Sequence, residues 1–186
     1  MTAPEPPLDC RRCPRLAAYR DENAARWPDW FNAPAGIADK TRAYETHATW
    51  LAEQAAEQAL SDAGLAAGDI DAIVFVSSTG IATPSIESRL MNIMPFRADV
   101  QRLPVFGLGC AGGVLGMTRA QQMAAAQPGS RVLLIVVELC TLAFRYDRLT
   151  KSNLVATALF GDGAAAAVLS SEGEGDAPLG ALGLGG

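Results

Sequence analysis

The residue with the clearest chemical potential is Cys110, which follows an apolar segment from about Arg102 to Leu108 and precedes a helical pattern. Three glycines, Gly109, Gly112 and Gly113, surround it and permit a sharp turn between strand and helix. Such a turn lifts a side chain clear of the sheet, and unpaired N–H groups at a helix start favour a thiolate. The same N–H groups could stabilise the oxyanion formed when a thiolate attacks a thioester. The pattern therefore makes Cys110 a candidate nucleophile.

The sequence of the turn by itself leaves two other interpretations of this segment open. A buried structural cysteine is a common state for the residue type, and position does not choose between the two roles. Residues 107–112 also spell G-x-G-x-x-G, and Glu138 ends the next strand, where a dinucleotide-binding fold places its ribose-binding acid. Against a dinucleotide site, the motif follows at least one earlier strand–helix unit and does not follow the first strand.

Apolar periodicity predicts alternating helices and strands through most of the chain. The expected strands are Ile70–Ser77, Arg102–Leu108, Arg131–Leu139 and Ala164–Ser170. Helices are expected over Tyr44–Ala63, from Thr83-Pro84 to Pro95, from the Cys110 turn to about Ala126, and over Leu154–Leu159. Residues 73–76 are apolar on both faces, which suits the centre of a sheet covered on both sides. The alternation predicts a three-layer α/β domain, with Gly161-Asp162-Gly163 as a tight turn into its last strand.

Composition divides the chain into three parts. Residues 1–34 hold Cys10, Cys13 and a cluster of aromatic side chains, and they differ in character from the remainder. Residues 35–172 carry the α/β pattern. Residues 173–186 are rich in glycine and are not expected to fold alone.

Charge and apolar content limit the classes of partner. Fifteen basic and 20 acidic residues give a net charge of −5, so there is no general electrostatic reason to bind nucleic acid or an anionic membrane. No apolar run approaches the roughly 20 residues that a membrane-spanning helix needs. The first residues lack the basic and apolar regions of a signal peptide, which predicts a cytoplasmic protein. Four cysteines are then expected to be free thiols or ligands, without a disulfide scaffold.

Four longer segments identify a family. Residues 76–85, 107–114, 137–144 and 153–164 closely resemble, in this order, bacterial type III polyketide synthases, which are relatives of chalcone and stilbene synthases. The resemblance covers about Ala35 to Ser171. It implies that residues 35–172 are the N-terminal half of a thiolase-like fold, a three-layer αβα architecture with a mixed sheet.

The resemblance also implies an activity. Enzymes of this family load an acyl group from coenzyme A onto a cysteine and extend it by decarboxylative condensation with malonyl-CoA. They then cyclise the product to a pyrone, a resorcinol or a related ring. They are homodimers and need no metal. For this chain the resemblance implies an acyltransferase with Cys110 as nucleophile, acyl-CoA and malonyl-CoA as substrates, and no cofactor.

Five further positions carry over from the family one at a time. Ser78 and Thr79 match a pair near the active-site cavity, and they also suit a plain strand end. Thr83 matches a residue that reaches across the dimer interface into the partner's cavity, and it also suits a helix cap. Cys140 and Ala143 match two pocket-lining positions, or they are simple core packing. Small side chains there would fit a long alkyl starter.

The rest of the family's catalytic triad has no match here. The family uses Cys-His-Asn, and its histidine and asparagine lie in the second half of a chain roughly twice this length. The only histidine, His47, is predicted to be a surface residue on the polar side of an early helix. Without a histidine general base the chain alone is expected to be inactive or nearly so. A lone half would also expose apolar surface.

The N-terminal segment resembles a different family. Residues 9–20 and 29–34 look like the opening of iron–sulfur uracil-DNA glycosylases, in which a C-x-x-C pair supplies two of four cluster ligands. A cluster or zinc site needs four ligands, and no glycosylase motif follows Cys10 and Cys13. An orphaned ligand pair is therefore the favoured interpretation. Two alternatives to the synthase remain: a non-catalytic dimerisation or interaction fragment, and an iron–sulfur protein linked to nucleic acid.

Overall fold

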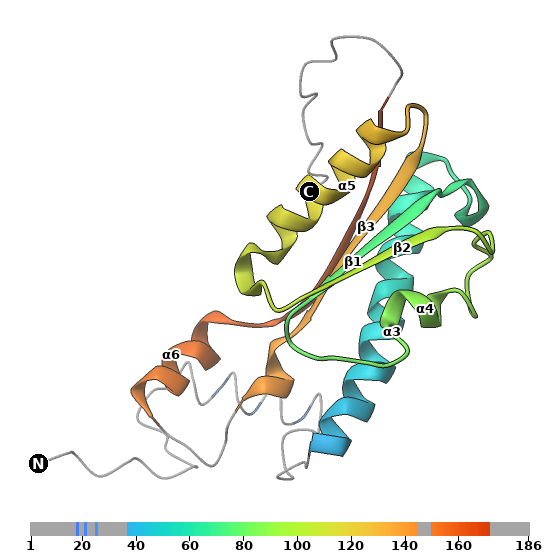
Figure 1. Ribbon diagram of the computed structural model, residues 1–186. Helices are drawn as coiled ribbons and strands as arrows, with labels where there is room; N and C mark the ends of the chain where they lie inside the picture. Colours follow the sequence, from blue (N-terminus) through green and yellow to red (C-terminus); the bar gives the residue numbers. More distant parts are fainter. Residues whose placement is uncertain (1–17, 19–20, 22–24, 26–36, 145–149, 172–186) are drawn as a thin grey trace, which may run out of the picture.

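The computed structural model describes residues 37–144 and 150–171, together with the isolated positions Ala18, Asp21 and Ala25 (Figure 1). Apart from those three positions, the predicted N-terminal segment and the glycine-rich tail lie outside the described residues. The helices are α3 (Ile37–Ala63), α4 (Ile86–Leu90), α5 (Gly112–Ala126) and α6 (Lys151–Leu159). The strands are β1 (Ala72–Ser77), β2 (Gln101–Phe106), β3 (Arg131–Leu139) and β4 (Asp162–Ser170). In these ranges, no helix is long and apolar enough to cross a membrane.

The four strands form one mixed sheet in the order β2-β1-β3-β4. Strands β2, β1 and β3 are parallel, and β4 runs antiparallel to β3. The register pairs Ser77 with Phe106 and Val76 with Val136. The carboxyl ends of the three parallel strands therefore meet at one edge of the sheet, which is the edge reached by the turn that carries Cys110.

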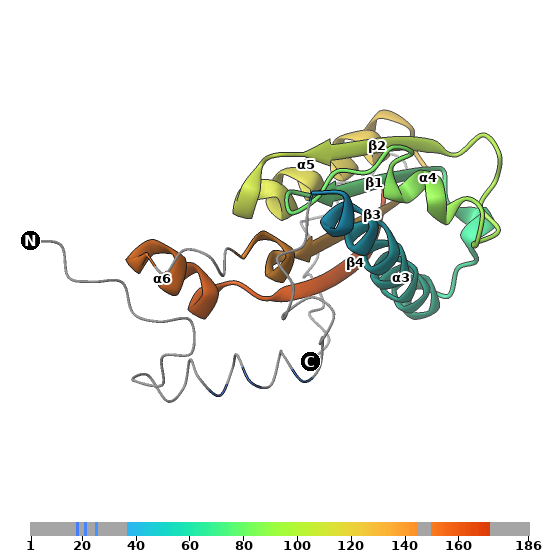
Figure 2. The same ribbon diagram turned by 90° about the horizontal axis from the view of Figure 1, so that it is seen from below.

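Helices cover both faces of this sheet, and the predicted three-layer architecture is confirmed. Helices α3 and α4 lie on one face and α5 lies on the other (Figures 1 and 2). Alternate residues of β1 divide between the layers, because Ile73 and Phe75 pack towards α3 while Val74 and Val76 pack towards α5. All six residues of β1 are buried, as expected for a strand with two apolar faces. No residue of α6 is buried.

Small residues let α5 lie close to the sheet. The buried positions of α5 recur every fourth residue, at Gly112, Gly116, Ala120 and Ala124. A Cβ atom placed on Gly116 would lie 2.5 Å from Cγ2 of Val76 on β1. Over its first turns the backbone of α5 therefore packs directly against the Val76 side chain of β1. This contact fixes the N-terminus of α5 relative to β1.

Three predicted helices differ from the observed ones. Helix α6 begins at Lys151, three residues before the predicted start at Leu154. Thr83-Pro84 does not begin a helix, because Ser85 still has extended backbone angles and α4 starts at Ile86. Residues 92 and 93 then bond three positions back, to Arg89 and Leu90, which tightens the turn and leaves Ile93 half exposed instead of buried.

The early helix begins at Ile37, about two turns before the predicted start at Tyr44. Its buried stripe was expected to continue through Ala55 and Ala59, and it instead follows every fourth residue to Ala56 and Leu60. The early part of the stripe, at Tyr44 and Ala48, was predicted correctly.

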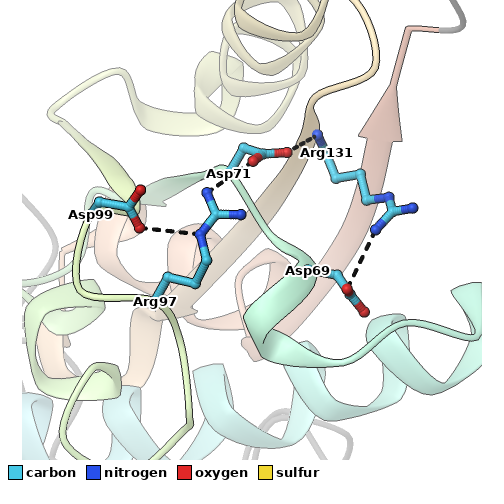
Figure 3. Close-up of polar contacts among 5 residues, drawn as sticks. All are labelled: Asp69, Asp71, Arg97, Asp99 and Arg131. Atoms are coloured by element: carbon cyan, nitrogen blue, oxygen red, sulfur yellow. Dashed lines mark hydrogen bonds and ion pairs between the residues drawn. The ribbon is translucent and has the colours of Figure 1, made fainter.

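Acidic and basic side chains join the strands at the opposite, amino-terminal edge of the sheet (Figure 3). The Asp71 carboxylate accepts the backbone N–H of Arg131 at 2.8 Å and the guanidinium of Arg97 at 2.9 Å. Arg97 also bonds Asp99 at 3.1 Å, and Arg131 lies 3.5 Å from Asp69. The hydrogen bond from Arg131, followed by Arg97, holds the pKa of Asp71 below its usual range, and partial burial opposes them.

Replacing Asp71 with asparagine is expected to lower the free energy of unfolding by about 1–2 kcal/mol at neutral pH, since a charge-assisted contact is lost. The folded-state pKa lies below the unfolded value of about 3.9, so this contribution is complete above that pH and disappears as pH falls through the folded-state pKa. Urea unfolding at pH 7 and at pH 3 measures the difference. Asp99→Asn, at a well-exposed carboxylate that bonds Arg97, is the matched control and should change little. An Asp71→Asn penalty that is equal at both pH values would contradict the assignment.

Candidate functional site at the carboxyl edge of the sheet

The chain turns sharply between β2 and α5, and Cys110 lies in that turn. Gly107 and Gly109 have φ angles of 82° and 55°, a left-handed conformation that glycine adopts without strain. A short 3-10 turn, Gly109–Ala111, then leads directly into α5. Cys110 is exposed, as the glycine pattern predicts for a nucleophile and not for a buried structural cysteine.

Ser78 joins the end of β1 to this turn. Its Oγ accepts the backbone N–H of Gly109 at 2.9 Å. Its own backbone N–H donates to both carboxylate oxygens of Glu138, each at 3.0 Å. The Gly109 N–H is therefore bonded already, so it is not one of the free donors that the sequence suggested for an oxyanion.

Thr79 makes the corresponding link to β3. Its Oγ1 accepts the backbone N–H of Leu139 at 2.8 Å. Ser78 and Thr79 are both partly buried and lie at the edge that carries Cys110, as their place in the sequence indicates. Their observed contacts hold the ends of three strands together, and their predicted contact with substrate stays a prediction.

Cys140 lies at the same edge, in the 3-10 turn Cys140–Ala143 that follows β3. It is partly buried. Burial raises the pKa of its thiol, and the negative charges of Glu138 and Asp162, together with Cys110, raise it further. A thiol held in the protonated form is a weak nucleophile, so the raised pKa makes Cys140 poorly suited to attack a thioester. Ala143 is exposed at the end of the turn.

Asp162 fixes the turn that holds Cys140. Its carboxylate accepts the backbone N–H of Thr141 at 2.8 Å and the Thr141 hydroxyl at 2.6 Å. Asp162 is the first residue of β4 and pairs with Leu139. The predicted tight turn at Gly161-Asp162-Gly163 is wrong, because Asp162 and Gly163 already belong to β4 and pair with β3. Asp162 is architectural in a different way, since its carboxylate holds the neighbouring turn.

Thr83 is exposed in the loop between β1 and α4. The helix-cap role considered for it is wrong, since Ser85 occupies the N-cap position. Its role across a dimer interface stays a prediction.

The prediction that His47 is a surface residue is also only partly right. The residue is partly buried on α3, and burial lowers the pKa of its imidazole, while the charge of Asp162 opposes the shift. Helix α3 contacts β4 as well as β3, and this second contact covers a side of the helix that the sequence assigned to solvent.

A buried polar group beneath this edge was not predicted. Glu87 and Ser77 are almost fully buried, and the Glu87 carboxylate bonds the hydroxyl of Ser85. Tyr44 of α3 is buried beside them, and burial, followed by the charges of Glu138 and Glu87, raises its pKa. The sequence signal that could have predicted this buried group is the position of Glu87, between the apolar residues Ile86 and Leu90 of α4.

Apolar side chains are exposed on both sides of Cys110. Phe106 and Leu108 precede it and are 54% and 41% exposed, and Val114 and Leu115 follow it and are 71% and 44% exposed. Such a concentration of exposed apolar side chains around one turn is typical of surface that a further protein element covers. Among the described residues, no group of three or more histidine, cysteine or acidic side chains could hold a metal ion. Cys10 and Cys13 lie outside those residues.

Comparison with known proteins decides the family. The profile of the N-terminal domain of chalcone and stilbene synthases matches residues 31–173. The chain belongs to this family. It is 48% identical over 140 residues to a 1,3,6,8-tetrahydroxynaphthalene synthase of Streptomyces peucetius, and 31% identical over 137 residues to a phloroglucinol synthase of Pseudomonas fluorescens. These matches cover 72% and 74% of this chain but only 36% and 39% of the two relatives.

Solved structures of type III polyketide synthases agree with the fold. The 1,3,6,8-tetrahydroxynaphthalene synthase of Streptomyces coelicolor superposes with a TM-score of 0.75 at 32% sequence identity, over 89% of this chain and 49% of that one. The prediction of an N-terminal part of a type III polyketide synthase is therefore confirmed. The dinucleotide-binding interpretation is not favoured, because the glycine motif follows the edge strand β2 and the Glu138 carboxylate bonds Ser78.

Proposed function

We propose that this chain carries the acyl-accepting cysteine of a type III polyketide synthase, with Cys110 as nucleophile and acyl-CoA as donor. The observation that supports it most strongly is the exposed thiol of Cys110, which follows two left-handed glycines at the carboxyl ends of the parallel strands. Cys110 also lies within residues 31–173, which match the N-terminal domain of chalcone and stilbene synthases. The thiolate attacks the thioester carbonyl, a bond forms between Sγ and the acyl carbon, and coenzyme A leaves as a thiol.

Extension of the polyketide needs catalytic groups that have no match in this sequence. Decarboxylative condensation with malonyl-CoA requires, by the family resemblance, a histidine and an asparagine from the second half of the fold. We propose that the only activity left to residues 35–172 alone is a single acyl loading of Cys110, without turnover, and that extension takes place only when a second half is present. The assembly we propose is a cytoplasmic homodimer that uses no metal and no cofactor, with Ser78, Thr79, Cys140 and Ala143 near the acyl chain and Thr83 at the dimer interface.

Intact-mass spectrometry after incubation with a long-chain acyl-CoA tests acyl loading. We expect a single acyl adduct on the wild type and on Cys140→Ala, and none on Cys110→Ala. Circular dichroism shows whether each variant is folded. An adduct that persists on folded Cys110→Ala would assign loading to another residue. A folded wild type without any adduct would support the alternative of an interaction fragment, for which the exposed Phe106 and Val114 are the favouring observation.

A further inference from the structure

Few contacts hold the turn that presents Cys110. Neither the 3-10 turn Gly109–Ala111 nor the start of α5 has a side-chain cap. Residues 106–111 are all exposed, so packing contributes little to their conformation. Among the described residues, the side-chain hydrogen bond that reaches this turn from another element is the one that the Oγ of Ser78 accepts from Gly109. The orientation of the Cys110 thiol therefore depends on where Ser78 is held.

Hydrogen bonds to β3, on the side of β1 away from the Cys110 turn, fix the position of Ser78 itself. Its N–H donates to both oxygens of Glu138, and the adjacent Thr79 accepts the N–H of Leu139. Glu138 is partly buried on β3, where it pairs with Gly163 of β4. A partly buried carboxylate needs hydrogen-bond donors, and the Ser78 N–H is one that β1 supplies. The bonds run from Glu138 through Ser78 to Gly109, and so from the third strand of the sheet to the residue before the nucleophile.

We propose that Glu138 and Ser78 are positioning residues that orient Cys110 for acyl transfer. This inference rests on the proposed function of Cys110 as acyl acceptor. It assigns the Ser78 hydroxyl to the protein backbone, in place of the direct substrate contact that the family resemblance implies. Glu138 acts through Ser78 and does not touch the reacting atoms.

The first measurement is backbone amide exchange of Gly109, followed by nuclear magnetic resonance on the chain as it exists. We expect Ser78→Ala to speed this exchange at least tenfold, because the acceptor is removed, and Ser78→Thr to restore it. Thr118→Ala is the matched control, since that hydroxyl bonds the carbonyl of Val114 within α5. Exchange of Gly109 at the wild-type rate in Ser78→Ala would overturn the proposal.

The second measurement is the single-turnover rate of acyl transfer from a long-chain acyl-CoA to Cys110. Ser78→Ala should lower the rate at saturating acyl-CoA about tenfold and leave the half-saturating concentration unchanged. The variant loses the hydrogen bond to the Gly109 N–H and no contact with the substrate. Glu138→Ala should have a similar effect, and the double variant should be no slower than either single one, because both act through one chain of bonds. Glu138→Met, which keeps the length of the side chain and removes both acceptor oxygens, serves if the alanine variant does not fold. Additive losses, or a change confined to the half-saturating concentration, would overturn the proposal.

A wild type that takes no acyl group would contradict the proposed function separately. Alkylation of Cys110 by iodoacetamide, quantified by peptide mass spectrometry, then decides the positioning role. A rate at least threefold slower in Ser78→Ala than in the wild type and Thr118→Ala supports it, and equal rates overturn it.

Discussion

Replacing Gly116 with valine is expected to lower the free energy of unfolding by about 3 kcal/mol, enough to leave much of the chain unfolded. A Cβ atom at this position would already lie 2.5 Å from Cγ2 of Val76 and 3.1 Å from Cδ1 of Leu134. Both neighbours lie in the apolar stretches of the two central strands and are 1% and 4% exposed, so neither can move without opening the core. The two methyl groups of valine would enlarge the overlap.

Gly113→Val is the matched control, because a Cβ atom there meets nothing within 4 Å. Both substitutions place the same side chain in the first two turns of α5, so their difference reports packing against the sheet and not helix propensity. Urea unfolding followed by circular dichroism measures both. A Gly116→Val chain as stable as Gly113→Val would show that α5 does not pack on β1 as described.

The order of the elements follows from the sequence because buried strands have a strong apolar signal. Residues 73–76 and 132–137 are apolar at every position, and each forms the predicted central strand. The edge strand β2 was predicted to run two residues too far, to Leu108, since apolar character continues past the point where Gly107 turns the chain. Periodicity does not encode strand direction, so the mixed sheet followed only from the family resemblance.

The site divides in the same way. The Cys110 turn could be predicted because its determinants, the glycines, are adjacent to it in the sequence. The bonds that hold the turn could not, because Ser78 and Gly109 are 31 residues apart and Glu138 lies 60 residues from Ser78. A serine at a strand end has the same local pattern whether its hydroxyl faces a ligand or a backbone amide. Only the sheet order, which places β1 between β2 and β3, brings these groups together.

The loop that carries Ser78 and Thr79 depends on a glycine that faces Tyr44. A Cβ atom on Gly80 would lie 2.3 Å from both Cγ and Cδ2 of the Tyr44 ring. The ring is 2% exposed, between α3 and the end of β1, and therefore has no free direction in which to turn. The absence of a side chain at Gly80 thus lets the loop lie flat on α3, with Ser78 and Thr79 in place to bond the neighbouring strand ends.

Gly80→Ala is accordingly expected to lower the free energy of unfolding by about 2–3 kcal/mol and to reduce acyl loading of Cys110 in the fraction that stays folded. Gly161→Ala is the control, since a Cβ atom there meets nothing within 4 Å. Combining Gly80→Ala with Tyr44→Leu, which removes the aromatic ring, should cost less than the sum of the two single changes, because each relieves the other's packing defect. Urea unfolding of the four chains gives the coupling free energy. Strictly additive losses would mean that the Tyr44 ring and the loop do not meet. They would contradict the contact between α3 and the loop that carries Ser78 and Thr79.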